Sequence, residues 1–132
     1  MTVPVLASWP PAARVTGHVL AGLGTVVGET DTTLKSLLAG DGRVIRVRRV
    51  GGTDNGVTDR ARVDVNVYAV DLSDAEATAE LARQRLISGP SATPHGVLDR
   101  AETDVGPHEI PSPDPEGYRI VSVTYRVSVR RR

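Results

Sequence analysis

The strongest constraint on the fold is a long alternation of apolar and polar residues between Tyr118 and Val129. Successive side chains of a strand point to opposite faces of a sheet, so this run predicts a strand with one buried and one polar face. The apolar positions are Val121, Val123, Tyr125, Val127 and Val129, and the polar positions are Ser122, Thr124, Arg126 and Ser128. The fold must therefore contain a sheet that is covered on one side.

Two earlier runs, Arg43–Val50 and Arg62–Val70, alternate in the same way. The segment between them, Gly51–Thr58, is dense in turn-forming residues, so the pair predicts an antiparallel hairpin with a long loop. Val97–Thr103 is a fourth strand candidate, although both of its faces are mixed. Asp104–Gly117 contains prolines at positions 107, 111, 113 and 115 and is predicted to be a loop.

Three segments have helical patterns: Ala13–Leu23, Thr33–Ala39 and Ser73–Ile87. The first is weakened by glycines. The second can be capped by Asp31 or Thr32 and stopped by Gly40. The third begins with the capping box that Ser73 forms with Glu76, and its apolar stripe is mostly alanine. A short extended segment is expected over Thr25–Thr30, and Ser91–Gly96 is expected to be a polar connector.

These elements predict an α+β fold, with a mainly antiparallel four-stranded sheet and helices packed on one face. At 132 residues the chain is expected to form a single domain, with residues 1–12 as an extended arm and residues 13–132 as the core. The other face of the sheet should stay polar. Its expected residues are Arg46, Arg48, Asp64, Asn66, Ser122, Thr124 and Arg126.

The composition favours a protein that associates with itself over one that uses thiolate chemistry or binds nucleic acid. There is no Phe, one Trp and three Tyr, so the core is aliphatic and buries less area per side chain than an aromatic one. A marginal monomer stabilised by association is the expected result. Cysteine is absent, which excludes disulfides and thiolate chemistry. Lys+Arg and Asp+Glu both number 16, whereas a dedicated nucleic-acid binder usually has a basic excess.

No residue constellation points to catalysis. His18, His95 and His108 lack the spacing of a metal site, and no G-x-S-x-G or phosphate-binding glycine motif is present. We therefore expect no enzyme activity, no metal and no cofactor. An acidic cluster (Asp99, Glu102, Asp104 and Glu109) could do acid–base work, but a solvated strand edge with Arg100 explains it better.

Arginines gather in two places, on the strand that begins at Arg43 and at Arg130–Arg132. Such clusters can contact phosphate or an acidic partner, or they can protect a sheet edge from aggregation. Edge protection is the preferred interpretation for the strand. The role of the C-terminal triplet stays open.

Four segments resemble tail-terminator proteins of long-tailed (siphovirus-type) phages that infect actinobacteria. They are R-V-R-R-V-G-G-T-D (46–54), R-V-D-V-N-V-Y-A (62–69), G-V-L-D-R-A-E-T-D-V-G-P-H-E-I-P (96–111) and the closing strand from Tyr118. The resemblance covers roughly residues 43–132. It implies a mixed sheet flanked by helices and assembly of the chain with itself as a homohexameric ring.

The resemblance also implies a role as a virion structural protein. The ring would cap the head-proximal end of the tail tube, end tube polymerisation and provide the joint to the head. Implied partners are the major tail tube protein and the head–tail connector or neck protein, with genomic DNA passing through without specific binding. The chain would be made in the host cytoplasm and associate with no membrane, since it shows no signal peptide or spanning segment.

Two predicted loops are the expected docking segments, because loops encode contacts at low structural cost. Their residues are Gly51, Gly52, Thr53, Asp54 and Asn55 in the first, and Asp104, Pro107, His108 and Glu109 in the second. The expected ring interface uses the sheet edges and the polar face, including Arg46, Asp64 and Arg126. A head-closure or neck-adaptor protein is the alternative, followed by a small nucleic-acid-binding module or a small enzyme.

Overall fold

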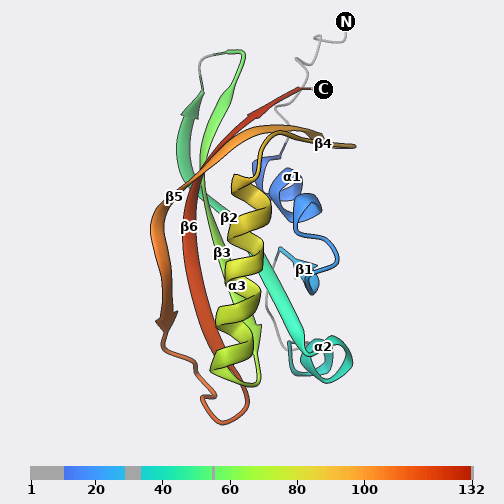
Figure 1. The fold of residues 1–132 in the computed structure, drawn as a ribbon, viewed down its shortest axis with the longest axis vertical. Coiled ribbons are helices and arrows are strands. Elements are labelled where there is room, and N and C mark those ends of the chain that lie inside the picture. Colours follow the sequence, from blue (N-terminus) through green and yellow to red (C-terminus); the bar gives the residue numbers. More distant parts are fainter. Residues whose placement is uncertain (1–10, 29–33, 55, 132) are drawn as a thin grey trace, which may run out of the picture.

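A computed structural model describes residues 11–28, 34–54 and 56–131, so most of the expected N-terminal arm lies outside the described residues. These described residues form three helices and six strands (Figure 1). In order they are α1 (Ala12–Val19), β1 (Thr25–Val27), α2 (Leu34–Asp41), β2 (Arg43–Asp54), β3 (Asp59–Ala69), α3 (Leu72–Ile87), β4 (Ser91–Thr93), β5 (Gly96–Ile110) and β6 (Arg119–Arg130).

The strands form one six-stranded sheet in the order β1-β2-β3-β6-β5-β4. β1 runs parallel to β2, and every other neighbouring pair is antiparallel. The α+β class is confirmed, but the predicted four-stranded sheet is wrong because β1 and β4 extend it at its two edges. Each of these strands has three residues, too few for an alternating pattern to reveal them.

The long strands continue into both predicted loops. β2 runs to Asp54, and β5 runs to Ile110 through glycine and proline. Bulges absorb these residues: the register shifts between Arg49 and Gly51 in β2 and at three places in β5. Glycine and proline therefore mark bulges of β2 and β5 here, where the sequence pattern suggested loops.

The main core lies between the sheet and the helices α1 and α3. Alternate residues of β3 and β6, such as Val65 and Val123, are almost completely buried there. Tyr125, with no exposed surface, is among the largest side chains in this core. An alanine stripe on α3 allows close approach to the sheet, as expected; its buried members include Ala75, Ala79 and Ala82.

A second, smaller cluster covers one end of the opposite face. Its sheet residues Val44, Tyr68 and Ile120 alternate with residues of the main core, so they point to the other side. Leu34 and Leu38 of α2 pack there. The expectation that the helices share one face is therefore wrong for α2, because a second apolar set at this end of the sheet requires its own cover.

Two helix boundaries differ from prediction for identifiable reasons. α3 begins at Leu72 because the carboxylate of Asp71 accepts hydrogen bonds from the backbone N–H groups of Ser73 (2.8 Å) and Asp74 (3.4 Å). Asp71 thus replaces the predicted capping box. α2 ends past Gly40, at Asp41, and the following Gly42 has φ +81° and donates its N–H to the Leu38 carbonyl.

Candidate functional site

The polar face of the sheet brings together the three residues that were expected at a ring interface. Arg46 on β2 pairs with Asn66, and Asp64 on β3 pairs with Thr124 of β6, whose hydroxyl donates to the Asp64 carboxylate at 2.7 Å. Arg126 lies further along β6. Asp64 and Arg126 therefore sit on the two central strands, away from both edges of the sheet.

Asp104 holds two arginines of this face together. Arg62 and Arg126 lie directly opposite each other on β3 and β6, an arrangement that is unfavourable for like charges. The Asp104 carboxylate lies 2.8 Å from Arg62 and 3.2 Å from Arg126. It reaches both because Asp104 sits in a bulge of β5, between Thr103 and Val105. Asp104 is therefore a structural partner of the sheet face instead of a loop residue.

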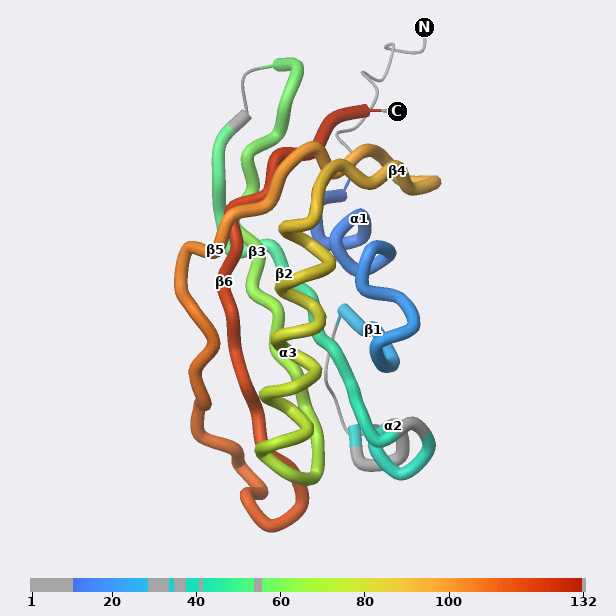
Figure 2. Tube along the Cα trace, viewed as in Figure 1, coloured from blue at the N-terminus to red at the C-terminus, as the bar shows by residue number. Residues whose placement is uncertain are grey.

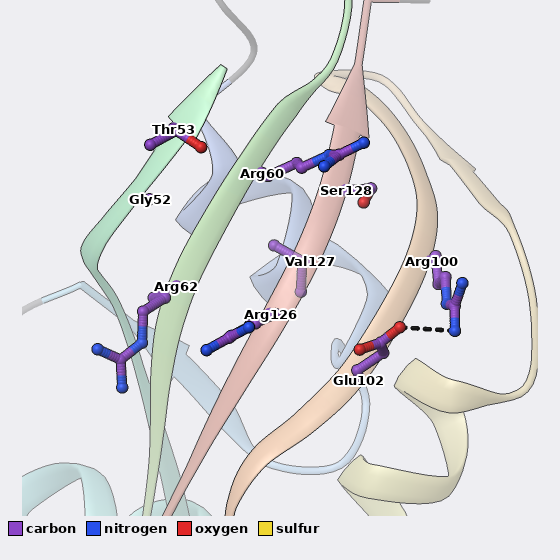
Figure 3. A pocket seen from close by; sticks show the side chains of 9 residues that line it. All are labelled: Gly52, Thr53, Arg60, Arg62, Arg100, Glu102, Arg126, Val127 and Ser128. Carbon is purple, nitrogen blue, oxygen red and sulfur yellow. Dashed lines mark ion pairs between the residues drawn. The ribbon is translucent and has the colours of Figure 1, made fainter. Parts of the chain in front are cut away.

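Arg62 and Arg126 also line a groove of about 530 Å³ in the polar face (Figure 3). Gly52 and Ser128 contribute almost no side-chain bulk, and arginines from three strands surround them. Arg100 is paired with Glu102 at 2.6 Å, whereas Arg60 has no ion-pair partner among the described residues. The full lining is Gly52, Thr53, Arg60, Arg62, Arg100, Glu102, Arg126, Val127 and Ser128.

Sequence reasoning missed this groove, since its arginines are distributed over β3, β5 and β6. Its signal becomes visible only when the strands are placed in register: Arg60 lies opposite Ser128, which lies opposite Arg100. The bulges of β5 set that register, and the alternation of apolar and polar residues in the sequence does not reveal where these bulges lie.

The first predicted docking segment is the end of the β2–β3 hairpin, which projects beyond the rest of the sheet (Figure 2). Gly51, Gly52, Thr53 and Asp54 belong to β2, and only residues 55–58 separate the two strands. Asn55 lies outside the described residues. A nearly buried Asp59 anchors the hairpin by its ion pair with Arg49, in which Nη2 donates to Oδ1 at 2.9 Å. Val57 near the tip is 71% exposed.

The second predicted docking segment is mostly strand. Asp104, Pro107, His108 and Glu109 all lie in β5, and His108 is hydrogen-bonded through Nδ1 to the Gly106 carbonyl. Glu109 pairs with Arg119 of β6 at 2.6 Å. The irregular connection is shorter, residues 111–118, and lies at the opposite end of the sheet from the hairpin tip (Figure 1).

Two stretches of strand edge carry no neighbour among the described residues. β4 pairs only with residues 96–98 of β5, so residues 99–110 of β5 form an open edge. β1 pairs only with residues 44–46 of β2, so residues 47–54 of β2 form another. Unpaired backbone groups of this kind are templates for pairing with a further chain.

Two of the three histidines come together. The rings of His18 and His95 lie edge to face with centroids 6.0 Å apart. Within residues 11–28, 34–54 and 56–131, no group of three metal-ligating side chains is found, and no helix is long and apolar enough to cross a membrane. Arg130, one of the C-terminal arginines, pairs with Asp99 at 2.9 Å.

A family profile described as phage tail termination protein matches residues 16–132. The chain belongs to this family. The match extends the earlier resemblance, which began at residue 43, to include the second half of α1 together with β1 and α2. A comparison with curated proteins gave no match. Among solved structures, a chain in the virion of a native gene transfer agent (GTA) particle aligns with a TM-score of 0.47 and 12% identity, covering 90% of this chain and 87% of that chain.

Proposed function

We propose that this phage tail termination protein forms a hexameric ring that caps the head-proximal end of the tail tube. The ring ends tube polymerisation and joins the tube to the head connector, and genomic DNA passes through its centre. The observation that carries this proposal is the family match over residues 16–132. The proposal gives the chain a structural role in the virion with no catalytic step.

The open edges supply a route to the ring. β2 and β5 lie on opposite sides of the central strands, and each neighbouring pair between them is antiparallel. If a copy is rotated about an axis parallel to the strands, its β2 edge meets the β5 edge of the first copy in antiparallel orientation. Such a contact joins two different surfaces, so repetition closes a ring when the rotation divides a full turn.

The two ends of the sheet supply separate docking segments. The hairpin tip, residues 51–58, lies at one end, and the connection of residues 111–118 lies at the other. In the proposed ring, every hairpin tip lies on one rim and every connection on the other. One rim would bind the major tail tube protein and the other the head connector, so that tube subunits cannot add beyond the ring.

The ring contact is tested by placing a charge on the open β5 edge. Val105 is 42% exposed there, and Leu81 on α3 is an apolar control with 48% exposure. We expect wild-type protein and Leu81→Asp to form open-centred rings by negative-stain electron microscopy. Val105→Asp should sediment as a smaller species. A wild type that stays monomeric at high concentration, or rings that persist in both variants, would refute the edge contact.

The docking roles are tested with purified tube and connector proteins. Replacing residues 53–58 by Asn-Gly should abolish binding to one partner and keep binding to the other. A protein that binds two connector components and not the tube would instead be a head-closure or neck adaptor. Loss of neither interaction would remove the hairpin from the docking surface.

A further inference from the structure

The polar face carries an arginine excess that the neutral composition conceals. The register places Arg46, Arg48, Arg60, Arg62, Arg100 and Arg126 on this face. The carboxylates of Asp64, Glu102 and Asp104 share it. Asp64 accepts from a hydroxyl, Glu102 pairs with Arg100, and Asp104 is divided between two arginines. Positive charge therefore remains in excess on one side of a chain whose net charge is zero.

Four of the arginines line the groove, where a ligand can come close to the backbone of the sheet. Gly52 and Ser128 leave space for it, and Arg60 stands at its side without a carboxylate partner among the described residues (Figure 3). Arg60 and Arg62 are two residues apart on β3, which spaces their Cα atoms by about 7 Å. Guanidinium groups at such intervals suit a polymer with regularly repeated anions.

The chemistry of the lining favours phosphates over bases. Arginine pairs bidentately with phosphate oxygens and always carries its charge. None of the described residues that line the groove is aromatic, so these residues offer no stacking platform for unpaired bases. Most of the charged groups that line the groove are guanidinium groups, which can pair with phosphates whatever the base sequence. Its contacts would position a nucleic-acid backbone without reading its sequence.

We propose that this groove binds the phosphodiester backbone of double-stranded DNA. The proposal rests on the proposed ring and adds that the polar faces line its channel, so that each copy presents one groove to the DNA. Because Glu102 and Asp104 of the same chain neutralise part of the arginine charge, each groove carries only a small excess of positive charge. The contact is accordingly weak, independent of sequence and sensitive to salt, which allows the DNA to move past it.

Fluorescence anisotropy of a labelled mixed-sequence duplex, measured from 50 to 200 mM salt, tests the groove. With three phosphate contacts, affinity should fall about 40-fold over this range. Arg60→Gln should weaken binding and reduce the salt slope by about 1. The matched control is Arg14→Gln. It removes the same charge from an exposed position of α1, on the side of the sheet that the helices α1 and α3 cover. It should leave both quantities unchanged.

Competitors identify the ligand. Unlabelled duplex should displace the probe, whereas polyglutamate or inorganic phosphate at equal charge should not. Salt-independent binding, equal effects of the Arg14 and Arg60 substitutions, or displacement by either competitor as effective as by duplex would overturn the proposal. Sedimentation of the same samples separates the two hypotheses. Intact rings without duplex binding refute the groove alone, and duplex binding without rings refutes the ring alone.

Discussion

Gly52 is the position where a single methyl group should damage the β2–β3 hairpin most. Its φ is +120°, and a Cβ built there would lie 2.6 Å from the Ala61 Cα and closer still to the Arg60 carbonyl oxygen. These are backbone atoms of the paired strand β3, so no side-chain rotation can relieve the contact. Gly51 has φ +150° but has nothing within 4 Å of an added Cβ.

The two glycines therefore separate backbone strain from steric overlap. An L-residue held at such a φ costs about 1–3 kcal/mol, and a cost of this kind applies to both positions. Overpacking adds about 1–3 kcal/mol at Gly52 only. The loss of chain entropy in the unfolded state is the same for both Gly→Ala changes and cancels in the comparison. Gly52→Ala should thus be less stable than Gly51→Ala by about 1–3 kcal/mol.

Urea unfolding followed by far-UV circular dichroism, at one fixed protein concentration, measures this difference. With an m-value of about 2 kcal/mol/M, the two midpoints should be separated by about 0.5–1.5 M. Local opening of the hairpin would limit the loss, and it would then appear as faster amide exchange in residues 51–61. Equal midpoints together with equal exchange rates would show that the close approach of β2 to β3 is not as described.

Three further substitutions test the helix cap, the core and one surface ion pair. Asp71→Ala removes the side-chain cap of α3 and should cost about 1 kcal/mol of unfolding free energy in urea. Tyr125→Phe should be neutral or slightly stabilising, because the buried hydroxyl has no hydrogen-bond partner in the described part of the chain. Burial also raises the pKa of Tyr125, so absorbance titration should detect its ionisation only on alkaline unfolding of wild type. Hydrogen bonding from Arg83 lowers the pKa of Glu80 from 4.5 to about 2. Since the folded pKa is the lower one, this contribution is complete above pH 4.5 and is lost as the pH falls toward 2, so Glu80→Gln should flatten thermal stability in that window.

The alternating runs predicted the long strands because their period of two directly reports burial on one face. Val63, Val65 and Val67 lie on the covered face as expected, and so do the apolar positions of β6. The same logic failed at Gly51 and Pro107. Local propensity marks these residues as loop formers, but the neighbouring strand holds them in bulges. The tertiary partner decides such positions, and its register is not contained in the local pattern.

The candidate site was predictable only as a polar face. Arg46, Asp64 and Arg126 were assigned to it correctly, since they alternate with buried valines. The groove needed more information, because Arg60 and Arg100 meet only after β3, β6 and β5 are aligned. The pairing of His18 with His95 depends on packing between distant elements and has no local signal either.

The three register shifts of β5 affect which strands can pair with its open edge. Each shift changes the local twist and displaces the hydrogen-bonding groups from the regular repeat of a flat strand. A generic extended peptide matches only short portions of this edge, so uncontrolled stacking into fibrils is disfavoured. The interrupted edge of β5 is therefore selective: it can pair along its length only with a strand whose own irregularities match its register shifts.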